Sequence, residues 1–96
     1  MAKHLTEAYR ADIENRTTGL QPHTRDGWRV AANDIGPGLV LRDSNVIISA
    51  FPVPHDGWAV SYGYRFETSD RVIVVSGDTR PSDAVVAACN GCDILV

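Results

Sequence analysis

One histidine and one aspartate in this sequence could bind a metal ion together. His55 comes just after the apolar segment 45–53, and Asp78 lies in a Ser-Gly-Asp-Thr tetrapeptide just after the β-branched segment 71–76. An imidazole nitrogen and a carboxylate oxygen suit Zn²⁺, Mn²⁺ or Fe²⁺. The structural alternative is that Asp78 caps its own turn and that His55 lies at the rim of a sheet.

Three predicted strands would bring these two residues together. The segments 45–53, 61–67 and 71–76 are joined by short loops, which favours an antiparallel meander. The first and third strands of a meander run in the same direction, so their carboxyl ends lie at one edge of the sheet, roughly 9 to 10 Å apart. Side chains from the two following loops could close this distance onto one ion.

The other elements predict an α+β chain with a mostly antiparallel sheet and two helices. The 96 residues, of which 44% are hydrophobic, predict a single folded domain. Strand 71–76 and the C-terminal strand are expected to be buried because they are almost entirely apolar. Periodicity and turn residues predict helices at about 5–17 and 82–90, and further strands at about 28–33, 39–42 and 92–96.

Charge and hydropathy exclude several classes of function. The net charge of −3 provides no basic surface for generic nucleic-acid binding. Apolar runs are too short to span a membrane, and the first residues lack the apolar stretch of a secretory signal. We therefore expect a cytoplasmic protein without a membrane partner.

The two cysteines form a Cys-x-x-Cys motif at Cys89 and Cys92. In a redox pair the first thiol lies at a helix N-terminus, where its pKa is lowered, whereas this pair straddles the C-terminal end of the predicted helix 82–90. A four-cysteine zinc site would need a second pair. We therefore expect both cysteines to be small buried thiols of the core.

Two further residues are candidates for substrate binding. Trp58, in the loop after the candidate ligand, could line the mouth of a site, or it could pack over the edge of the sheet. Arg80 could orient an anionic substrate, or it could form a surface ion pair with Asp83. Ser76 and Thr79 lack a neighbouring base, so a serine-type nucleophile is not favoured.

Four segments in order resemble the later part of the metallo-β-lactamase-fold hydrolases, and most closely their ribonuclease Z and arylsulfatase-like branch. The resemblance covers about residues 39–96. The segments are Phe-Pro-Val-Pro-His at 51–55, Tyr-Gly-Tyr-Arg-Phe-Glu at 62–67, Val-Val-Ser-Gly-Asp-Thr-Arg-Pro at 74–81 and Cys-Asn-Gly-Cys-Asp-Ile-Leu-Val at 89–96.

The resemblance implies part of an αββα sandwich and assigns roles to two residues. His55 corresponds to a metal ligand of the family, and Asp78 to the aspartate that bridges two metal ions. The implied cofactor is a divalent metal, with Zn²⁺ favoured over Mn²⁺ or Fe²⁺. The implied reaction is hydrolysis of a small-molecule ester or phosphodiester by a metal-activated water.

The sequence also departs from the family pattern. It contains neither the His-x-His-x-Asp-His motif nor the final histidine of the family, and His4 and His23 are poor replacements because they lie outside any matching motif. We therefore expect residues 1–96 to be a partial domain with an incomplete site, weak metal binding and no activity alone. The alternative is a non-catalytic structural or interaction half-domain. In either case we expect self-association through an exposed sheet face.

Overall fold

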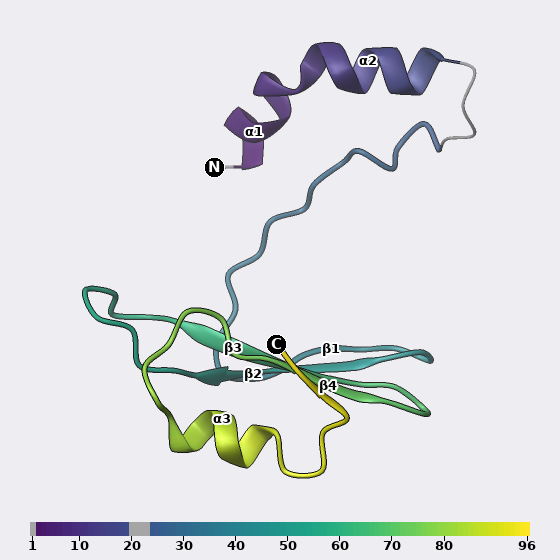
Figure 1. The fold of residues 1–96 in the computed structure, drawn as a ribbon. Helices are drawn as coiled ribbons and strands as arrows, with labels where there is room; N and C mark the ends of the chain where they lie inside the picture. Colours follow the sequence, from purple (N-terminus) through teal and green to yellow (C-terminus); the bar gives the residue numbers. More distant parts are fainter. Residues whose placement is uncertain (1, 20–23) are drawn as a thin grey trace. The chain divides into compact units, whose positions relative to one another are not determined.

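The computed structural model describes residues 2–19 and 24–96 of the chain. The chain divides into two compact units, residues 1–34 and residues 35–96. Figure 1 shows the helices α1 and α2 in the first unit and the sheet in the second. Both candidate metal ligands belong to the second unit.

The first unit contains two consecutive helices where the sequence predicted one at about 5–17. They are α1 (Ala2–Ala8) and α2 (Arg10–Thr18), with Tyr9 between them. The Tyr9 N–H donates to the Leu5 carbonyl over 3.2 Å, and the Tyr9 carbonyl accepts from the Ile13 N–H over 2.9 Å. The hydrogen-bond pattern of a helix therefore passes through the interruption.

The predicted strand at 28–33 is wrong. Residues 25–28 form a turn, and residues 29–36 have no regular secondary structure. Asp26 and Arg29 form an ion pair of 3.0 Å in this turn, and the Arg29 N–H also donates to the Asp26 carbonyl. Alternation of Trp28, Val30 and Ala32 resembles a strand, but a strand also needs a neighbouring backbone to pair with.

The second unit is built on a five-stranded sheet in the order β1-β2-β3-β4-β5. The strands β2, β3 and β4 form the predicted antiparallel meander, β1 extends it antiparallel to β2, and β5 lies parallel to β4 after the helix α3. A mostly antiparallel α+β fold is thus confirmed, with three helices in the described residues. The elements are β1 (Gly38–Arg42), β2 (Ile47–Pro52), β3 (Tyr62–Glu67), β4 (Val72–Val75), α3 (Asp83–Ala88) and β5 (Ile94–Leu95).

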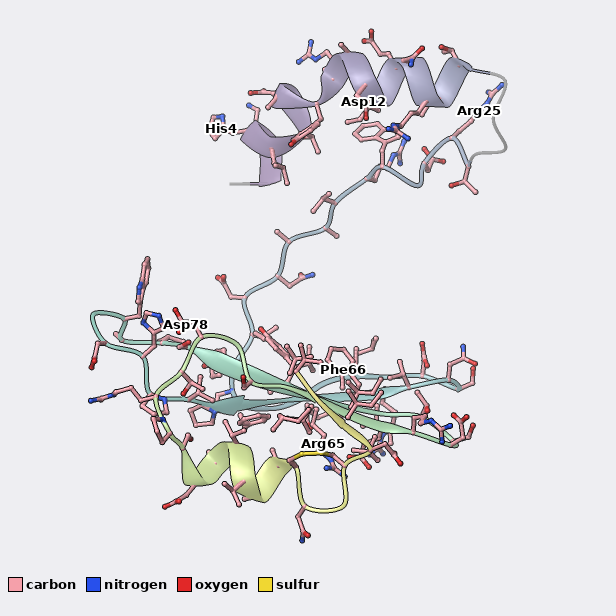
Figure 2. The ribbon with its side chains drawn as sticks, in the orientation of Figure 1. His4, Asp12, Arg25, Arg65, Phe66 and Asp78 are labelled. Atoms are coloured by element: carbon pink, nitrogen blue, oxygen red, sulfur yellow. A yellow bond between two sulfur atoms is a disulfide. The ribbon has the colours of Figure 1, made fainter. Side chains whose placement is uncertain are left out.

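The helix α3 covers one face of the sheet. Arg65 of β3 projects on that side, where its guanidinium donates to the Ala88 carbonyl at the end of α3. Figure 2 shows Arg65 on the side of α3 and Phe66 on the opposite side. Within the described residues, only Ala50, Val53 and Val74 are buried hydrophobic residues. The core is therefore small.

The sequence predicted that strand 71–76 and the C-terminal strand are buried, and both predictions are wrong for the chain by itself. Val74 is fully buried, but the other residues of β4 are only half-buried. In β5, Ile94 and Leu95 are 47% and 55% exposed. An apolar run indicates that a strand can be covered on both faces, but it cannot supply the second layer.

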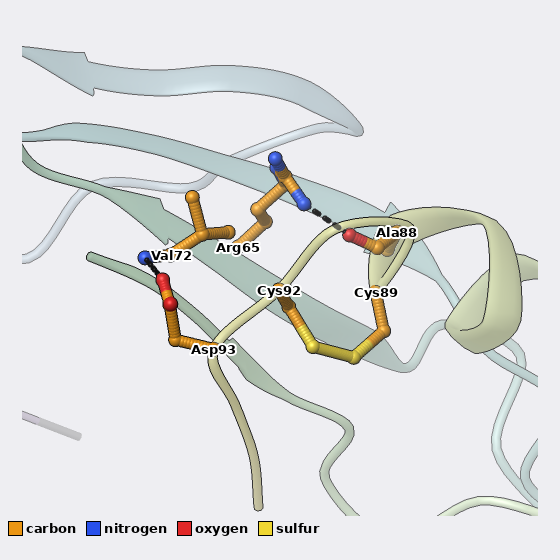
Figure 3. The surroundings of a disulfide bond; sticks show 6 residues. All are labelled: Arg65, Val72, Ala88, Cys89, Cys92 and Asp93. Carbon is orange, nitrogen blue, oxygen red and sulfur yellow. Dashed lines mark hydrogen bonds between the residues drawn. A yellow bond between two sulfur atoms is a disulfide. The ribbon is translucent and has the colours of Figure 1, made fainter. Parts of the chain in front are cut away.

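The prediction of free, buried cysteines is also wrong. Cys89 and Cys92 form a disulfide across the turn between α3 and β5 (Figure 3), and both residues are half-buried. The Cys92 N–H donates to the Cys89 carbonyl over 3.0 Å, and this turn brings the two Cα atoms to 4.8 Å. The distance lies within the range that a disulfide requires. Among the described residues, no helix is both long and apolar enough to cross a membrane.

Candidate functional site

His55 and Asp78 lie at the same end of the sheet, as the meander predicted. The strands β2 and β4 run in the same direction, and the loops that follow them contain the two residues. His55 Nε2 lies 3.0 Å from Asp78 Oδ2. Figure 2 shows Asp78 at this end, away from the turns that join β1 to β2 and β3 to β4. Their predicted convergence is confirmed.

Both ring nitrogens of His55 face oxygen acceptors. Nδ1 lies 3.0 Å from the backbone carbonyl oxygen of Asp56, and Nε2 faces the carboxylate of Asp78. A neutral imidazole can donate to only one of them, whereas the imidazolium can donate to both. The hydrogen bond with Asp78, followed by that with the Asp56 carbonyl, therefore raises the pKa of His55 above its usual value.

The two side chains differ in their contact with solvent. The His55 side chain is 25% exposed, whereas that of Asp78 is 91% exposed. Asp78 thus has free access to water or to a ligand on the side away from the imidazole. The ring of His55 is the more restricted partner, and the Asp56 carbonyl determines its orientation.

Two hydrogen bonds to one backbone carbonyl and an ion pair hold the loops together. The Pro54 carbonyl accepts both the hydroxyl of Thr79, over 3.0 Å, and the N–H of Arg80, over 3.1 Å. The guanidinium of Arg80 lies 3.3 Å from the Asp56 carboxylate. The predicted pair of Arg80 with Asp83 is therefore replaced by a pair with Asp56, which lies across the site rather than along the chain.

Glycines allow the sharp turns of both loops. Gly57 and Gly77 have φ angles of +82° and +67°, which other L-residues rarely adopt. Gly57 follows the Asp56 that orients the imidazole, and Gly77 directly precedes Asp78. A Cβ atom on Gly77 would also lie 3.3 Å from the Tyr62 carbonyl oxygen. The backbone around both candidate ligands is therefore constrained.

Trp58 and Arg80 both lie near the site, but they are connected to it by different contacts. The Trp58 N–H donates to the His55 carbonyl over 3.3 Å, but Trp58 is 71% exposed. That exposure does not fit a side chain packed over the edge of the sheet. Arg80 is held by Asp56, so binding of an anionic substrate would compete with this ion pair. A substrate-binding role stays a prediction for both residues.

The described residues supply two candidate metal ligands at this place. No group of three or more His, Cys, Asp and Glu residues suited to a metal ion occurs in ranges 2–19 and 24–96. His4 pairs with Glu7 in the first unit at 3.5 Å. His23 lies outside the described residues. A catalytic zinc normally takes three protein ligands, so further ligands would have to come from outside the described chain.

The sequence did not reveal two supporting residues, Asp56 and Thr79. The sequence placed a loop after His55, but it did not indicate that the Asp56 carbonyl would face the imidazole. Thr79 was considered only as a nucleophile, whereas its hydroxyl donates to the opposite loop. The role of Thr79 depends on an acceptor 25 positions away, which no local pattern specifies, whereas the Asp56 carbonyl is next to His55 in the chain and its role depends on the local backbone turn.

Comparisons of this chain with protein-family models, curated proteins and solved structures find no match. Its candidate site consequently rests on the geometry of His55, Asp78 and the loops that hold them.

Proposed function

We propose that this chain contributes part of the metal site of a hydrolase that acts on an ester or phosphodiester. The observation that supports this proposal best is the 3.0 Å distance between His55 Nε2 and Asp78 Oδ2 at one end of the sheet. Two donors that are each about 2.1 Å from one tetrahedral ion are about 3.4 Å apart, so a small movement of the exposed Asp78 side chain would bring this pair to that spacing. The pair is therefore close enough to bind a single ion.

The surroundings of His55 also suit a metal ligand. Nδ1 faces the Asp56 carbonyl, and a metal-binding histidine usually donates its second N–H to such an oxygen. Asp78 is exposed and can turn toward a second ligand group. The nitrogen and oxygen donors favour Zn²⁺, with Mn²⁺ or Fe²⁺ as alternatives. When bound, such an ion would lower the pKa of a water molecule and polarise the substrate oxygen.

In such a site, the residues of this chain would bind the metal ion and orient its ligands. His55 would provide a neutral imidazole and Asp78 a carboxylate, while Asp56 would keep the imidazole in its tautomer. Arg80, which pairs with Asp56, lies where it could attract a phosphodiester anion. The chain alone would not turn over substrate, because two ligands leave an ion too weakly held.

Paramagnetic broadening of NMR signals by Mn²⁺ tests the metal site directly. We expect millimolar Mn²⁺ to broaden the amide signals around His55 and Asp78 first, and Zn²⁺ to compete with it. His55→Ala should abolish this local broadening, whereas the control His4→Ala should preserve it. Broadening centred on His4 and Glu7, with none at His55, would contradict the proposal.

Activity measurements separate a partial site from a complete one. With saturating Zn²⁺ and a chromogenic phosphodiester such as bis-p-nitrophenyl phosphate, we expect no turnover by these 96 residues alone. Turnover that is lost in Asp78→Asn, but not in Asp83→Asn, would show that the chain holds a more complete site than two ligands.

A second candidate function is a non-catalytic structural or interaction domain that self-associates. The small core favours it, because the described residues bury only three hydrophobic residues. Under this function the His55–Asp78 pair only closes the two loops. Mn²⁺ broadening at His55 distinguishes the two candidates, since an interaction domain has no reason to bind the ion there.

A cytoplasmic location is also retained as a proposal, and the cysteines provide its test. Stable disulfides are typical of oxidising compartments and rare in the cytoplasm. In a cytoplasmic protein we expect Cys89 and Cys92 to be mainly reduced when cells are quenched with a thiol-alkylating reagent and the chain is analysed by mass spectrometry. A fully oxidised pair under these conditions would argue for another compartment.

A further inference from the structure

A disulfide-bridged turn, residues 89–92, is anchored to the sheet on both sides. Before the turn, the guanidinium of Arg65 on β3 donates to the Ala88 carbonyl at the end of α3. After the turn, the Asp93 N–H donates to the Val72 carbonyl and the Asp93 carboxylate accepts the Val72 N–H, each over 2.7 Å. Figure 3 shows these anchors on either side of the disulfide. The sheet therefore fixes both ends of the turn.

These anchors link the disulfide to the docking of β5. They hold the Cα atoms of Cys89 and Cys92 4.8 Å apart, so each thiol of the reduced turn has a high effective concentration beside the other. Such linkage is reciprocal: if docking of Asp93 on β4 favours the disulfide, the disulfide favours that docking by the same factor. Oxidation should therefore keep β5 docked, and reduction should release it.

The strand β5 has little else to hold it. It contains two residues and lies at the edge of the sheet. Ile94, Leu95 and Val96 are 47%, 55% and 69% exposed, so they bury little apolar surface. A segment with few buried contacts opens at a low cost in free energy. Its docking therefore depends on hydrogen bonds to β4 and on the turn that precedes it.

Docking of β5 also supports the backbone that leads to Asp78. The Val96 N–H donates to the Val74 carbonyl over 2.8 Å, and the Val96 carbonyl accepts the Ser76 N–H over 2.9 Å. Only Gly77 separates Ser76 from Asp78. Release of β5 would replace the Ser76 hydrogen bond by one to water, and the loop before Asp78 would loosen.

We propose that Cys89 and Cys92 form a redox switch, in which the disulfide keeps β5 docked on β4 and reduction releases it. Both cysteines are half-buried, so a small dithiol can reach them. Cys89 follows the C-terminal end of α3, where the helix carbonyls disfavour a thiolate. Slow thiol exchange suits a switch better than a catalyst of disulfide exchange.

Each transition of the switch uses a thiol compound from outside the chain. In reduction, a thiolate of a dithiol attacks the disulfide, a mixed disulfide forms, and the second thiol of the reagent displaces the protein thiol. The protein gains two protons and two electrons, and the dithiol leaves as a disulfide. Oxidation by a disulfide compound such as oxidised glutathione reverses this and releases two thiols.

Amide hydrogen exchange measured by NMR tests the switch without any metal ion, so its outcome is separate from that of the metal site. After reduction with dithiothreitol, exchange at Ser76 and Val96 should be at least about fivefold faster, while exchange in the β2–β3 pairing stays unchanged. The double variant Cys89→Ser/Cys92→Ser should exchange like the reduced chain with or without dithiothreitol. Equal rates at Ser76 and Val96 in both redox states, or an equal acceleration in β2 and β3, would overturn the proposal.

Equilibration with reduced and oxidised glutathione measures the reciprocal effect. Asp93→Ala removes the carboxylate that accepts the Val72 N–H, so the equilibrium constant for forming the disulfide should fall about fivefold. The control Asp70→Ala removes a carboxylate that bonds to Thr68 within the β3–β4 turn, and the constant should stay unchanged. The same constant in Asp93→Ala as in the unaltered chain would contradict the linkage between the disulfide and β5.

Discussion

The loops at the two ends of the sheet are closed by different kinds of hydrogen bond. At the end with the β1–β2 and β3–β4 turns, the turn residues pair with sequence neighbours: Asp43 Oδ1 accepts the N–H groups of Asn45 and Val46 over 2.7 and 2.8 Å. One long-range bond at this end, from the Val72 N–H to Asp93 Oδ2, joins β4 to the residue before β5 and lies outside the turns. At the site end, the bonds of His55 with Asp78 and of Thr79 with Pro54 join residues 23 and 25 positions apart.

This difference shows which end depends on the whole sheet. A turn such as 43–46 can close by itself because its donors and acceptor are already near each other in the chain. The site end can close only after β2, β3 and β4 have paired in the correct register, because its partners lie in loops on either side of β3. Changes to register or loop backbone should therefore affect the site more than the turns.

The largest effect is expected from Gly63→Ala. Gly63 lies opposite Phe51, and an added Cβ atom would lie 2.5 Å from the ring of Phe51 and 3.1 Å from the Val75 carbonyl. Overpacking of this kind costs about 1 to 3 kcal/mol of unfolding free energy. Urea denaturation measures it, with Gly36→Ala as the control because no atom lies within 4 Å of its Cβ position. Equal stability of the two variants would contradict the close packing of β2 on β3.

The next effect is expected from Gly77→Ala. An alanine with φ near +67° costs about 1 to 2 kcal/mol, and here the Tyr62 carbonyl adds a close contact. Gly91→Ala is the matched control, because Gly91 has a φ of +74° but open space at its Cβ position. Both variants should lose stability, but only Gly77→Ala should change the NMR signals of the His55 ring. A His55 ring unaffected by Gly77→Ala would contradict the linkage between this backbone and the site.

Replacing a threonine at each end compares the ends directly. Thr79→Val removes the hydroxyl that donates to the Pro54 carbonyl, and Thr68→Val removes one that bonds within the β3–β4 turn. One hydrogen bond usually contributes about 1 kcal/mol, so Thr79→Val should cost about that much, and Thr68→Val at least as much because the Thr68 hydroxyl also accepts the Arg71 N–H. Only Thr79→Val should shift the His55 ring signals, and Thr79→Ser should restore them. A similar shift in Thr68→Val would show that the two ends are not independent.

The smallest expected effect is the dependence of stability on pH, which has opposite directions at the two ends of the sheet. The pKa of His55 is raised, so its stabilising contribution is complete below about pH 6.5 and is lost as pH rises through the raised pKa. The backbone N–H groups of Asn45 and Val46 lower the pKa of Asp43, so its contribution is present above about pH 4 and is lost as pH falls through the lowered pKa.

NMR titration measures both changes in one sample. The Arg80 amide signal should move on the alkaline side and the Val46 amide signal on the acid side, because each reports the loop beside the titrating group. His55→Gln should remove only the alkaline change, and Asp43→Ala only the acid change. An alkaline change that survives in His55→Gln would assign it to another group.

Several features followed from local pattern. The four antiparallel strands and α3 appeared within a few residues of their predicted limits, because alternation, β-branched runs and turn residues act over short distances. The meeting of His55 and Asp78 followed as well, since short loops between successive strands make β2 and β4 run in the same direction.

The remaining features required the folded chain. Arg80 pairs with Asp56 rather than with the nearer Asp83, and Cys89 pairs with Cys92 instead of packing as a free thiol. Residues 28–33 alternate like a strand but have no strand beside them. The sequence also did not determine which face of the sheet is covered by α3. Arg65 and Phe66 are neighbours on β3 and point to opposite faces, and only the position of α3 shows which of the two faces is covered. Partners far apart in sequence depend on register, and a shift of one residue would exchange the two faces of every strand.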